Sequence, residues 1–226
     1  MARYTLIVGT RNWSSWSLRP FVALKATAAP YELVDIELRR SEPPTTREQI
    51  LKHSPAGKVP VLKIEDGGST LTVWDSLAIC ETLAERHPEA GLWPGDPAIR
   101  AIARSYAAEM HSGFPDLRDQ LSMDFARRKE LPQLRDDTRT QIARILSAWD
   151  TALGQYKGEF LFGNLSVADC MYAPVVSRFR TYGLETSKPV AAYMDRVMAL
   201  PAMQEWMKAA QTEVDAGLPV TMPSLR

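Results

Sequence analysis

Hydrophobic and polar positions recur with two different periods in the first part of the chain. Residues 4–8 form an apolar run that predicts a buried strand, and residues 17–28 carry apolar side chains at helical spacing. Val34, Ile36 and Leu38 alternate with acidic residues, which is the period of a strand with one wet face. The pattern therefore predicts a strand, a helix and a second strand in that order.

The next elements are shorter and are separated by turn residues. We expect a helix at 47–53, the two strands of a hairpin at 61–64 and 71–73, and a helix at 77–86. Glu65-Asp66-Gly67-Gly68 between the two strands is a hairpin signal. The order strand, helix, strand, helix, hairpin, helix is typical of a thioredoxin-like layer of helices on a mixed sheet.

A second region begins after a stretch rich in proline and glycine, residues 87–97, which has the composition of a linker. Beyond it no strand pattern appears. Helical spacing is carried by four segments, at 99–111, 133–156, 166–182 and 189–200. We therefore expect a thioredoxin-like α/β domain over residues 1–86, a linker over 87–97 and an all-helical C-terminal domain over 98–226.

Composition and charge exclude several classes of partner. Hydrophobic residues make up 45% of the chain, and 27 Lys+Arg balance 27 Asp+Glu, so the broad basic field needed for nonspecific nucleic-acid binding is absent. No apolar run approaches the ~20 residues that span a bilayer, and the N-terminal run is too short for a signal-peptide core. We expect a cytoplasmic protein whose partners include neither nucleic acid nor membrane.

The cysteines suggest neither disulfide nor metal chemistry. Cys80 and Cys170 are far apart in sequence, and no ligand cluster surrounds the three histidines. We expect both thiols to pack as small core side chains and the chain to hold no metal site.

Candidate chemistry begins at a group of hydroxyls between the first strand and the first helix, Ser14-Ser15-Trp16-Ser17. A hydroxyl at a helix N-terminus can donate to a thiolate that a ligand supplies, and so lower the thiol pKa from its usual value of roughly 8.5. Ser14 is the first candidate for this donor and Ser15 the second. The alternative is that a serine here only caps the helix.

A second motif, Trp74-Asp75-Ser76, joins the end of a predicted strand to a predicted helix. The Ser76 hydroxyl and the amides that follow it form an anion site, and Asp75 can accept from an ammonium group. Together they suit the two charges of an amino acid. Helix capping alone also explains an Asp-Ser pair at this place.

These motifs, read with Arg19 and with Lys58-Val59-Pro60, resemble the cytosolic glutathione S-transferases of bacteria. The serine motif is most similar to the zeta class, whose motif reads S-S-C-S with an arginine shortly after. The resemblance covers nearly the whole chain. Trp16 and Asp75 depart from the zeta pattern, which has a cysteine and a glutamate at these positions.

The resemblance implies glutathione as co-substrate, with its sulfur beside Ser14 or Ser15. It also implies a cis bond between Val59 and Pro60, so that the Val59 backbone pairs with the cysteinyl part of glutathione. Lys58 would then meet the glycyl carboxylate. Asp75 and Ser76 would hold the γ-glutamyl group.

The function that the resemblance implies is a detoxifying glutathione S-transferase, active as a homodimer, that directs the glutathione thiolate at a small electrophile. Two alternatives stay open: a glutathione-dependent isomerase of the maleylacetoacetate type, and a noncatalytic interaction module of the same fold. A dithiol reductase is disfavoured because the Ser14-Ser15-Trp16-Ser17 motif contains no cysteine.

Expectations for the second domain concern the electrophile pocket and one capping motif. Apolar lining between the domains is expected from Trp13, Tyr106, Met110 and Phe114, the last three on one helical face, unless they form core. Arg178 and Arg180 either meet an acidic substrate or stay solvated. Residues 166–169 resemble the family's helix-capping box, with a role in folding.

Overall fold

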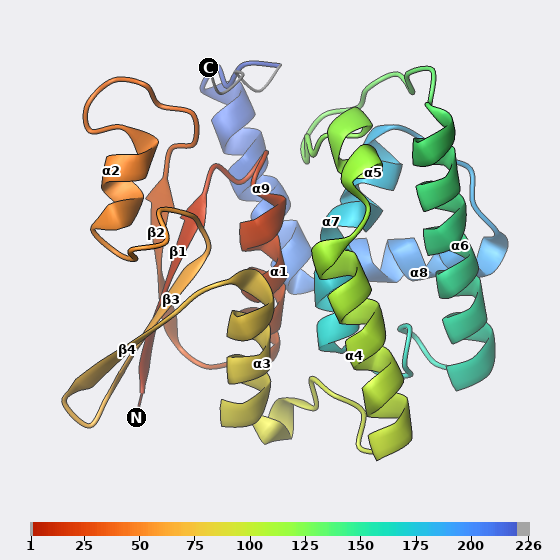
Figure 1. Ribbon diagram of the computed structural model, residues 1–226, viewed down its shortest axis with the longest axis horizontal. Coiled ribbons are helices and arrows are strands. Elements are labelled where there is room, and N and C mark those ends of the chain that lie inside the picture. Colours follow the sequence, from red (N-terminus) through yellow and green to blue (C-terminus); the bar gives the residue numbers. More distant parts are fainter. Residues whose placement is uncertain (1, 221–226) are drawn as a thin grey trace.

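A four-stranded mixed sheet lies at one end of the computed structural model, which describes residues 2–220 (Figure 1). Its strands are β1 (Arg3–Gly9), β2 (Tyr31–Ile36), β3 (Val61–Asp66) and β4 (Ser69–Val73), in the spatial order β2-β1-β3-β4. β1 and β2 run parallel, and β3 is antiparallel to both β1 and β4. The expected fold class, a thioredoxin-like domain followed by a helical one, is confirmed.

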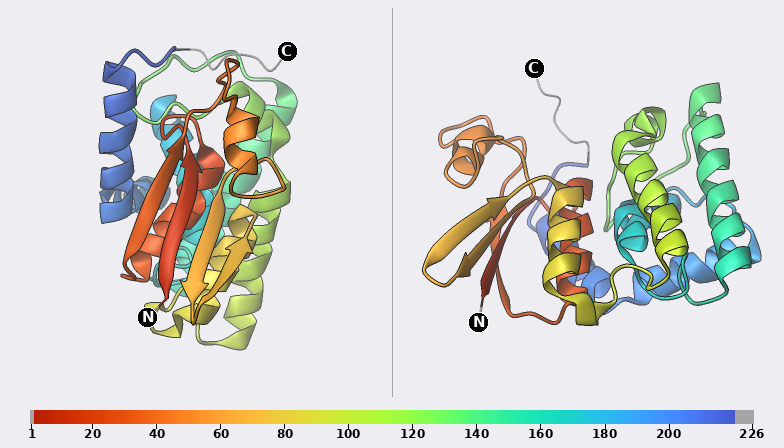
Figure 2. Two further views of the ribbon diagram at one scale, coloured as in Figure 1. Left: turned by 90° about the vertical axis from the view of Figure 1, so that its left-hand side faces the viewer. Right: turned by 60° about the horizontal axis from the view of Figure 1, so that its bottom comes forward.

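The two faces of the sheet are covered by different helices. α1 (Ser15–Ala26) and α3 (Ser76–Arg86) lie on the face toward the rest of the molecule, and α2 (Thr46–Leu51) lies on the other (Figures 1 and 2). Successive side chains of a strand point to opposite faces, so Leu6 belongs to the main core and Ile7 to a small cluster on the side of α2.

The second half of the chain is helical. After a short 3-10 turn at Pro88–Ala90 come α4 (Pro97–Ser112), α5 (Pro115–Gln120), α6 (Asp136–Tyr156), α7 (Val167–Thr181), α8 (Lys188–Ala199) and α9 (Pro201–Asp215). Almost every residue of α7 is buried, and α7 packs against both α1 and α4. The core is therefore continuous from the sheet through α1 into the helical domain.

Two helices, α5 and α9, were not predicted by the pattern. α5 is only 6 residues long. α9 begins directly after α8, and Leu200 is at once the C-cap of α8 and the N-cap of α9. The first helix also begins earlier than expected, at Ser15, since Ser14 serves as its N-cap.

The capping box at the start of α7 and the burial of both cysteines are confirmed. The Ser166 N–H donates to the Asp169 carboxylate at 2.8 Å, within a fully buried environment. Cys80 and Cys170 are completely buried, and burial raises the pKa of each thiol. Within residues 2–220, no helix has the length and apolar character needed to cross a bilayer, and no cluster of potential metal ligands is present.

Candidate functional site

A cleft of about 360 Å³ opens where the N-terminal domain meets the end of α4. Its lining combines residues from the loop before β3, from both sides of the β4–α3 junction, from α1 and from α4: Trp16, Ala56, Lys58, Val59, Pro60, Trp74, Asp75, Ser76 and His111. The structure thus brings Lys58, Val59, Asp75 and Ser76 together, as the sequence analysis expected. A volume of this size is at the lower end for small-molecule sites.

One wall of the cleft is backbone. The bond between Val59 and Pro60 is cis, as expected, and so is the bond between Trp74 and Asp75. No hydrogen bond joins the N–H or C=O of Val59 to another group in residues 2–220. Val59 therefore presents a free donor and a free acceptor in the cleft, which is what an extended peptide needs for pairing.

The N-terminus of α3 forms a second wall. Asp75 caps the helix, since its Oδ1 accepts from the N–H groups of Leu77 and Ala78 at 3.1 and 3.3 Å. Its Oδ2 lies 3.0 Å from Nε2 of His111. The Ser76 hydroxyl is buried and has no hydrogen-bond partner in the described chain. Helix capping thus accounts for Oδ1 of Asp75 but not for Oδ2, and the Ser76 hydroxyl is available to a ligand.

The serines stand at the N-terminus of α1, directly before the cleft residue Trp16. Ser14 is the N-cap, and its Oγ accepts from the Ser17 N–H at 3.4 Å and lies 2.8 Å from the Ser17 Oγ. The Ser17 Oγ in turn accepts from the Gly9 N–H at 3.1 Å. Ser15 makes no side-chain hydrogen bond within residues 2–220. Both candidates are nearly buried, and neither belongs to the lining of the cleft, whereas Trp16 does.

His111 is a residue of the cleft that the sequence analysis missed. It comes from the last turn of α4, and its ring meets Trp16 edge to face at a centroid distance of 5.4 Å. Its pairing with Asp75 crosses between the domains. A single histidine near the end of a helix carries no sequence signal for such a contact.

Three arginines gather behind Trp16. Arg19 and Arg118 stack on its ring, with their guanidinium carbons 4.3 and 4.8 Å from the ring centroid. Arg19 is fully buried, and none of its side-chain nitrogens has a partner in residues 2–220. Burial, reinforced by repulsion from Arg118 and Arg178, lowers the pKa of Arg19. Asp75 attracts Arg19 and acts in the opposite sense, and none of the three arginines belongs to the lining of the cleft.

The two C-terminal candidates Arg178 and Arg180 differ in their surroundings. Arg178 is buried and donates to the Leu121 carbonyl at 2.8 Å, so the expectation of a solvated side chain is wrong for it. Burial lowers its pKa to about 9. Arg180 is partly exposed and pairs with the exposed Asp195, as a solvated arginine does.

The residues expected to line an electrophile pocket belong to the core instead. Met110 is fully buried, Trp13 and Phe114 nearly so, and the Tyr106 hydroxyl donates to the Ala148 carbonyl. Phe114 does not share the face of α4, because the helix ends at Ser112 and Phe114 adopts a left-handed conformation with φ of 62°. None of the four lines the cleft.

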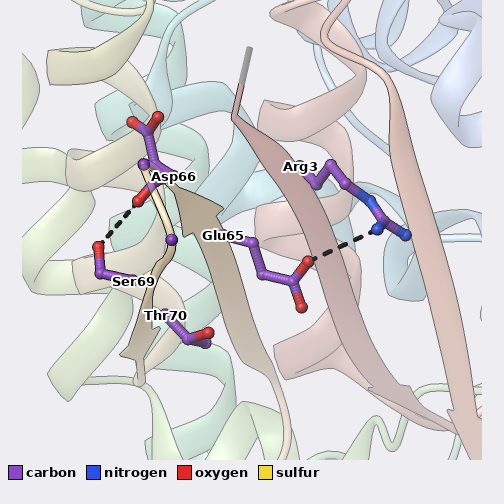
Figure 3. A pocket seen from close by; sticks show the side chains of 7 residues that line it. Arg3, Glu65, Asp66, Ser69 and Thr70 are labelled. Atoms are coloured by element: carbon purple, nitrogen blue, oxygen red, sulfur yellow. Dashed lines mark hydrogen bonds and ion pairs between the residues drawn. The ribbon is translucent and has the colours of Figure 1, made fainter.

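A second hollow lies at the tip of the β3–β4 hairpin (Figure 3). Figure 3 shows an ion pair between Arg3 and Glu65 at 3.7 Å and a hydrogen bond from the Ser69 hydroxyl to the Asp66 carbonyl. These side chains are exposed and satisfy one another. We therefore take the interdomain cleft as the candidate site.

The fold and the cleft together define a two-domain protein with a thioredoxin-like domain that presents a cis-proline loop and two helix N-termini. Family profiles agree with this class. The profile "Glutathione S-transferase, N-terminal domain" matches residues 13–86, and "Glutathione S-transferase, C-terminal domain" matches residues 132–209. The chain belongs to the glutathione S-transferase family.

Individual relatives cover nearly the whole chain. Maleylacetoacetate isomerase of Mus musculus is 30% identical over 216 residues, which are 92% of this chain and 94% of that protein. A glutathione transferase homologue from Burkholderia GL BGR1, solved with bound glutathione, superposes with a TM-score of 0.69 at 26% identity, covering 93% of this chain and 98% of the other. Maleylacetoacetate isomerase from Anaeromyxobacter dehalogenans 2CP-1, solved with glutathione in its active site, gives a TM-score of 0.65 at 28% identity, covering 91% and 94%.

Proposed function

We propose that the protein is a glutathione S-transferase that binds glutathione in the interdomain cleft and stabilises it as the thiolate for attack on an electrophilic carbon. The observation that carries the proposal is the convergence, in one cleft, of the free Val59 backbone with the buried, unpartnered hydroxyl of Ser76. Relatives solved with bound glutathione support the same ligand.

Each end of the tripeptide has a matching group in the cleft. The Val59 N–H and C=O pair with the cysteinyl residue as a strand would. The Ser76 hydroxyl and the N-terminus of α3 receive the γ-glutamyl carboxylate, and Asp75 accepts from the ammonium. Lys58 lines the cleft and meets the glycyl carboxylate.

Ser14 is the proposed donor to the thiolate. In the structure its hydroxyl faces Ser17, and the two oxygens are 2.8 Å apart. Hydroxyl protons rotate, so Ser17 can donate to Ser14 while Ser14 donates to the sulfur. The Gly9 N–H then supports the oxygen of Ser17. A chain of this kind strengthens each of its hydrogen bonds and lowers the pKa of the bound thiol.

Binding to immobilised glutathione, followed by activity profiling, tests the proposal. We expect retention on glutathione-agarose and turnover of at least one substrate among halonitroarenes, haloacids, peroxides and maleyl diacids. A protein that passes straight through the column and turns over none of them would instead be a noncatalytic module of the same fold.

Ser76→Ala is expected to raise the KM for glutathione by roughly 10- to 100-fold, since a hydrogen bond to a charged group contributes about 1.5–3 kcal/mol. Thermal stability should hardly change, because the Ser76 hydroxyl has no partner within the described protein. The matched control is Ser69→Ala, at the exposed hairpin tip. Equal KM values in the two variants would remove Ser76 from the glutathione site.

An isomerase of the maleylacetoacetate type is the second candidate, and the arginines behind Trp16 favour it. Arg19 has no side-chain hydrogen-bond partner within residues 2–220, and Arg118 and Arg178 donate to backbone carbonyls, so their positive charge would favour an electrophile that carries carboxylates. The comparison of a maleyl diacid with its neutral diester separates the candidates. Preference for the diacid by kcat/KM supports the isomerase, and preference for the diester supports transfer to neutral electrophiles.

We also propose that the protein is a cytoplasmic homodimer with a role in detoxification. Homodimerisation follows from the family, and it agrees with large apolar side chains left exposed on β4, at the β4–α3 junction and on α4: Leu71, Trp74 and Ile102. A cytoplasmic place and a role in detoxification follow from the same likeness. Sedimentation of the purified protein tests the dimer.

A further inference from the structure

Hydrogen bonds of Asn12 hold the loop between β1 and α1 to the helical domain. This residue is fully buried and uses all of its polar groups. Its side-chain amide donates to Asp124 at 2.6 Å and accepts from the Ala126 N–H at 2.9 Å. Its carbonyl accepts from the Phe125 N–H at 3.1 Å. The last of its polar groups, the backbone N–H, donates to Glu213 on α9.

Glu213, near the end of α9, accepts hydrogen bonds from the backbone of this loop with both carboxylate oxygens. Oε1 accepts from the Arg11 N–H at 2.7 Å, and Oε2 accepts from the Asn12 N–H at 2.8 Å. Trp206, two turns earlier on the same helix, donates from Nε1 to the Arg11 carbonyl at 2.7 Å. The guanidinium of Arg11 is engaged elsewhere, by Asp35 at 2.6 Å.

The backbone that Glu213 and Trp206 bind lies just before Ser14, the proposed thiolate donor. The Ser14 N–H donates to the Thr10 carbonyl at 2.8 Å, so Arg11 and Asn12 lie inside the turn that sets the position of Ser14. A displacement of the two amides held by Glu213 therefore displaces the Ser14 hydroxyl. Misplacement of a catalytic group by about 1 Å can reduce turnover by about 100-fold.

We propose that Glu213 is a positioning residue, which holds the Arg11–Asn12 backbone from the C-terminal helix and thereby fixes the Ser14 hydroxyl for the glutathione thiolate. The inference rests on the proposed function. A carboxylate is required because both of its oxygens accept. In Glu213→Gln one oxygen becomes an NH2 group, which would face an N–H donor and leave it without an acceptor.

The test is the titration of glutathione bound to the full-length protein, followed by the ultraviolet absorbance of the thiolate. We expect Glu213→Gln to raise the apparent pKa of the bound thiol by about 1, which is a ~10-fold loss of thiolate stabilisation. The matched control is Glu205→Gln, since Glu205 on α9 also reaches the N-terminal domain but contacts Lys25 and Tyr31, away from the loop. It should titrate like the parent protein.

A double variant separates positioning from general destabilisation. If Glu213 acts through Ser14, Glu213→Gln adds nothing to the thiol pKa once Ser14 is alanine. An equal further rise in the Ser14→Ala background, or a Glu213→Gln variant that titrates like Glu205→Gln, would overturn the inference. If Glu213→Gln does not fold, Glu213→Asp decides: a raised thiol pKa supports the inference, and an unchanged one overturns it.

These outcomes are distinct from a failure of the proposed function. In that case glutathione added to the parent protein would titrate as it does in free solution, and Ser14→Ala would leave its pKa unchanged.

Discussion

Ser14→Ala is expected to lower turnover by ~10- to 1000-fold while the affinity for glutathione changes less, as for the loss of a hydrogen bond that acts on the developing nucleophile. The Ser14 hydroxyl caps the N-terminus of α1, and the positive end of the helix dipole also favours a negative charge there. The measurement is steady-state kinetics on whichever electrophile the activity profile selects.

Two comparisons show whether the loss belongs to the hydroxyl. Ser14→Ala also removes the acceptor for the Ser17 N–H, and loss of such a cap costs about 1 kcal/mol of stability. Ser14→Thr keeps both hydroxyl and cap, and is expected to recover most of the activity. Ser15→Ala should stay close to the parent. A large loss in Ser15→Ala alone would move the role to Ser15, and no loss in either variant would refute the serine assignment.

Asp169→Ala is expected to lower the free energy of unfolding by about 3–5 kcal/mol, the range for breaking a buried charged network. Asp169 accepts from the Leu161 N–H and the Tyr193 hydroxyl, at 3.1 Å each, as well as from both donors of Ser166. Its removal leaves these groups unpaired in the interior.

Urea-induced unfolding measures this loss, with Asp195→Ala as the control. Asp195 is exposed on α8, and Arg180 is its one ion-pair partner among residues 2–220, so its removal should change the free energy of unfolding by less than about 1 kcal/mol. If the two aspartates give equal losses, the capping box at the start of α7 does not stabilise the fold in the way described.

The sequence predicted best where structure is local. The Gly67-Gly68 turn and the capping box at Ser166 each need only neighbouring residues, and both appear at the expected places. The alternation falls only partly within β2, which begins at Tyr31 and ends at Ile36, before Leu38. The helix expected at 189–200 ends where α8 ends, but the helix α9 that follows it was missed, because Pro201 was read only as the end of one helix and here also begins another.

For the cleft, the sequence analysis named four lining residues of the thioredoxin-like domain, whereas its catalytic candidates Ser14 and Ser15 lie outside the lining and a residue from α4 was missed. Lys58, Val59, Asp75 and Ser76 form short motifs and share the cleft. His111 was missed because it joins the cleft only through the packing of one domain on the other. Such contacts leave no spacing pattern in a single chain.

The burial of Arg178 follows from the position of its helix in the fold. The helix α7 is buried on nearly all sides, so its arginine cannot reach bulk water and turns to a backbone carbonyl. Ser14 caps α1 in the structure, and this capping is compatible with its proposed role as thiolate donor, because a hydroxyl can accept from the Ser17 N–H and donate to a sulfur at the same time.

The most direct test of the account is the crystal structure of the protein with glutathione. We expect the tripeptide in the interdomain cleft, its cysteinyl backbone paired with Val59, its γ-glutamyl carboxylate on Ser76 and its sulfur within hydrogen-bond distance of the Ser14 hydroxyl. A sulfur remote from both Ser14 and Ser15, or a cleft without glutathione at saturating concentration, would contradict the account.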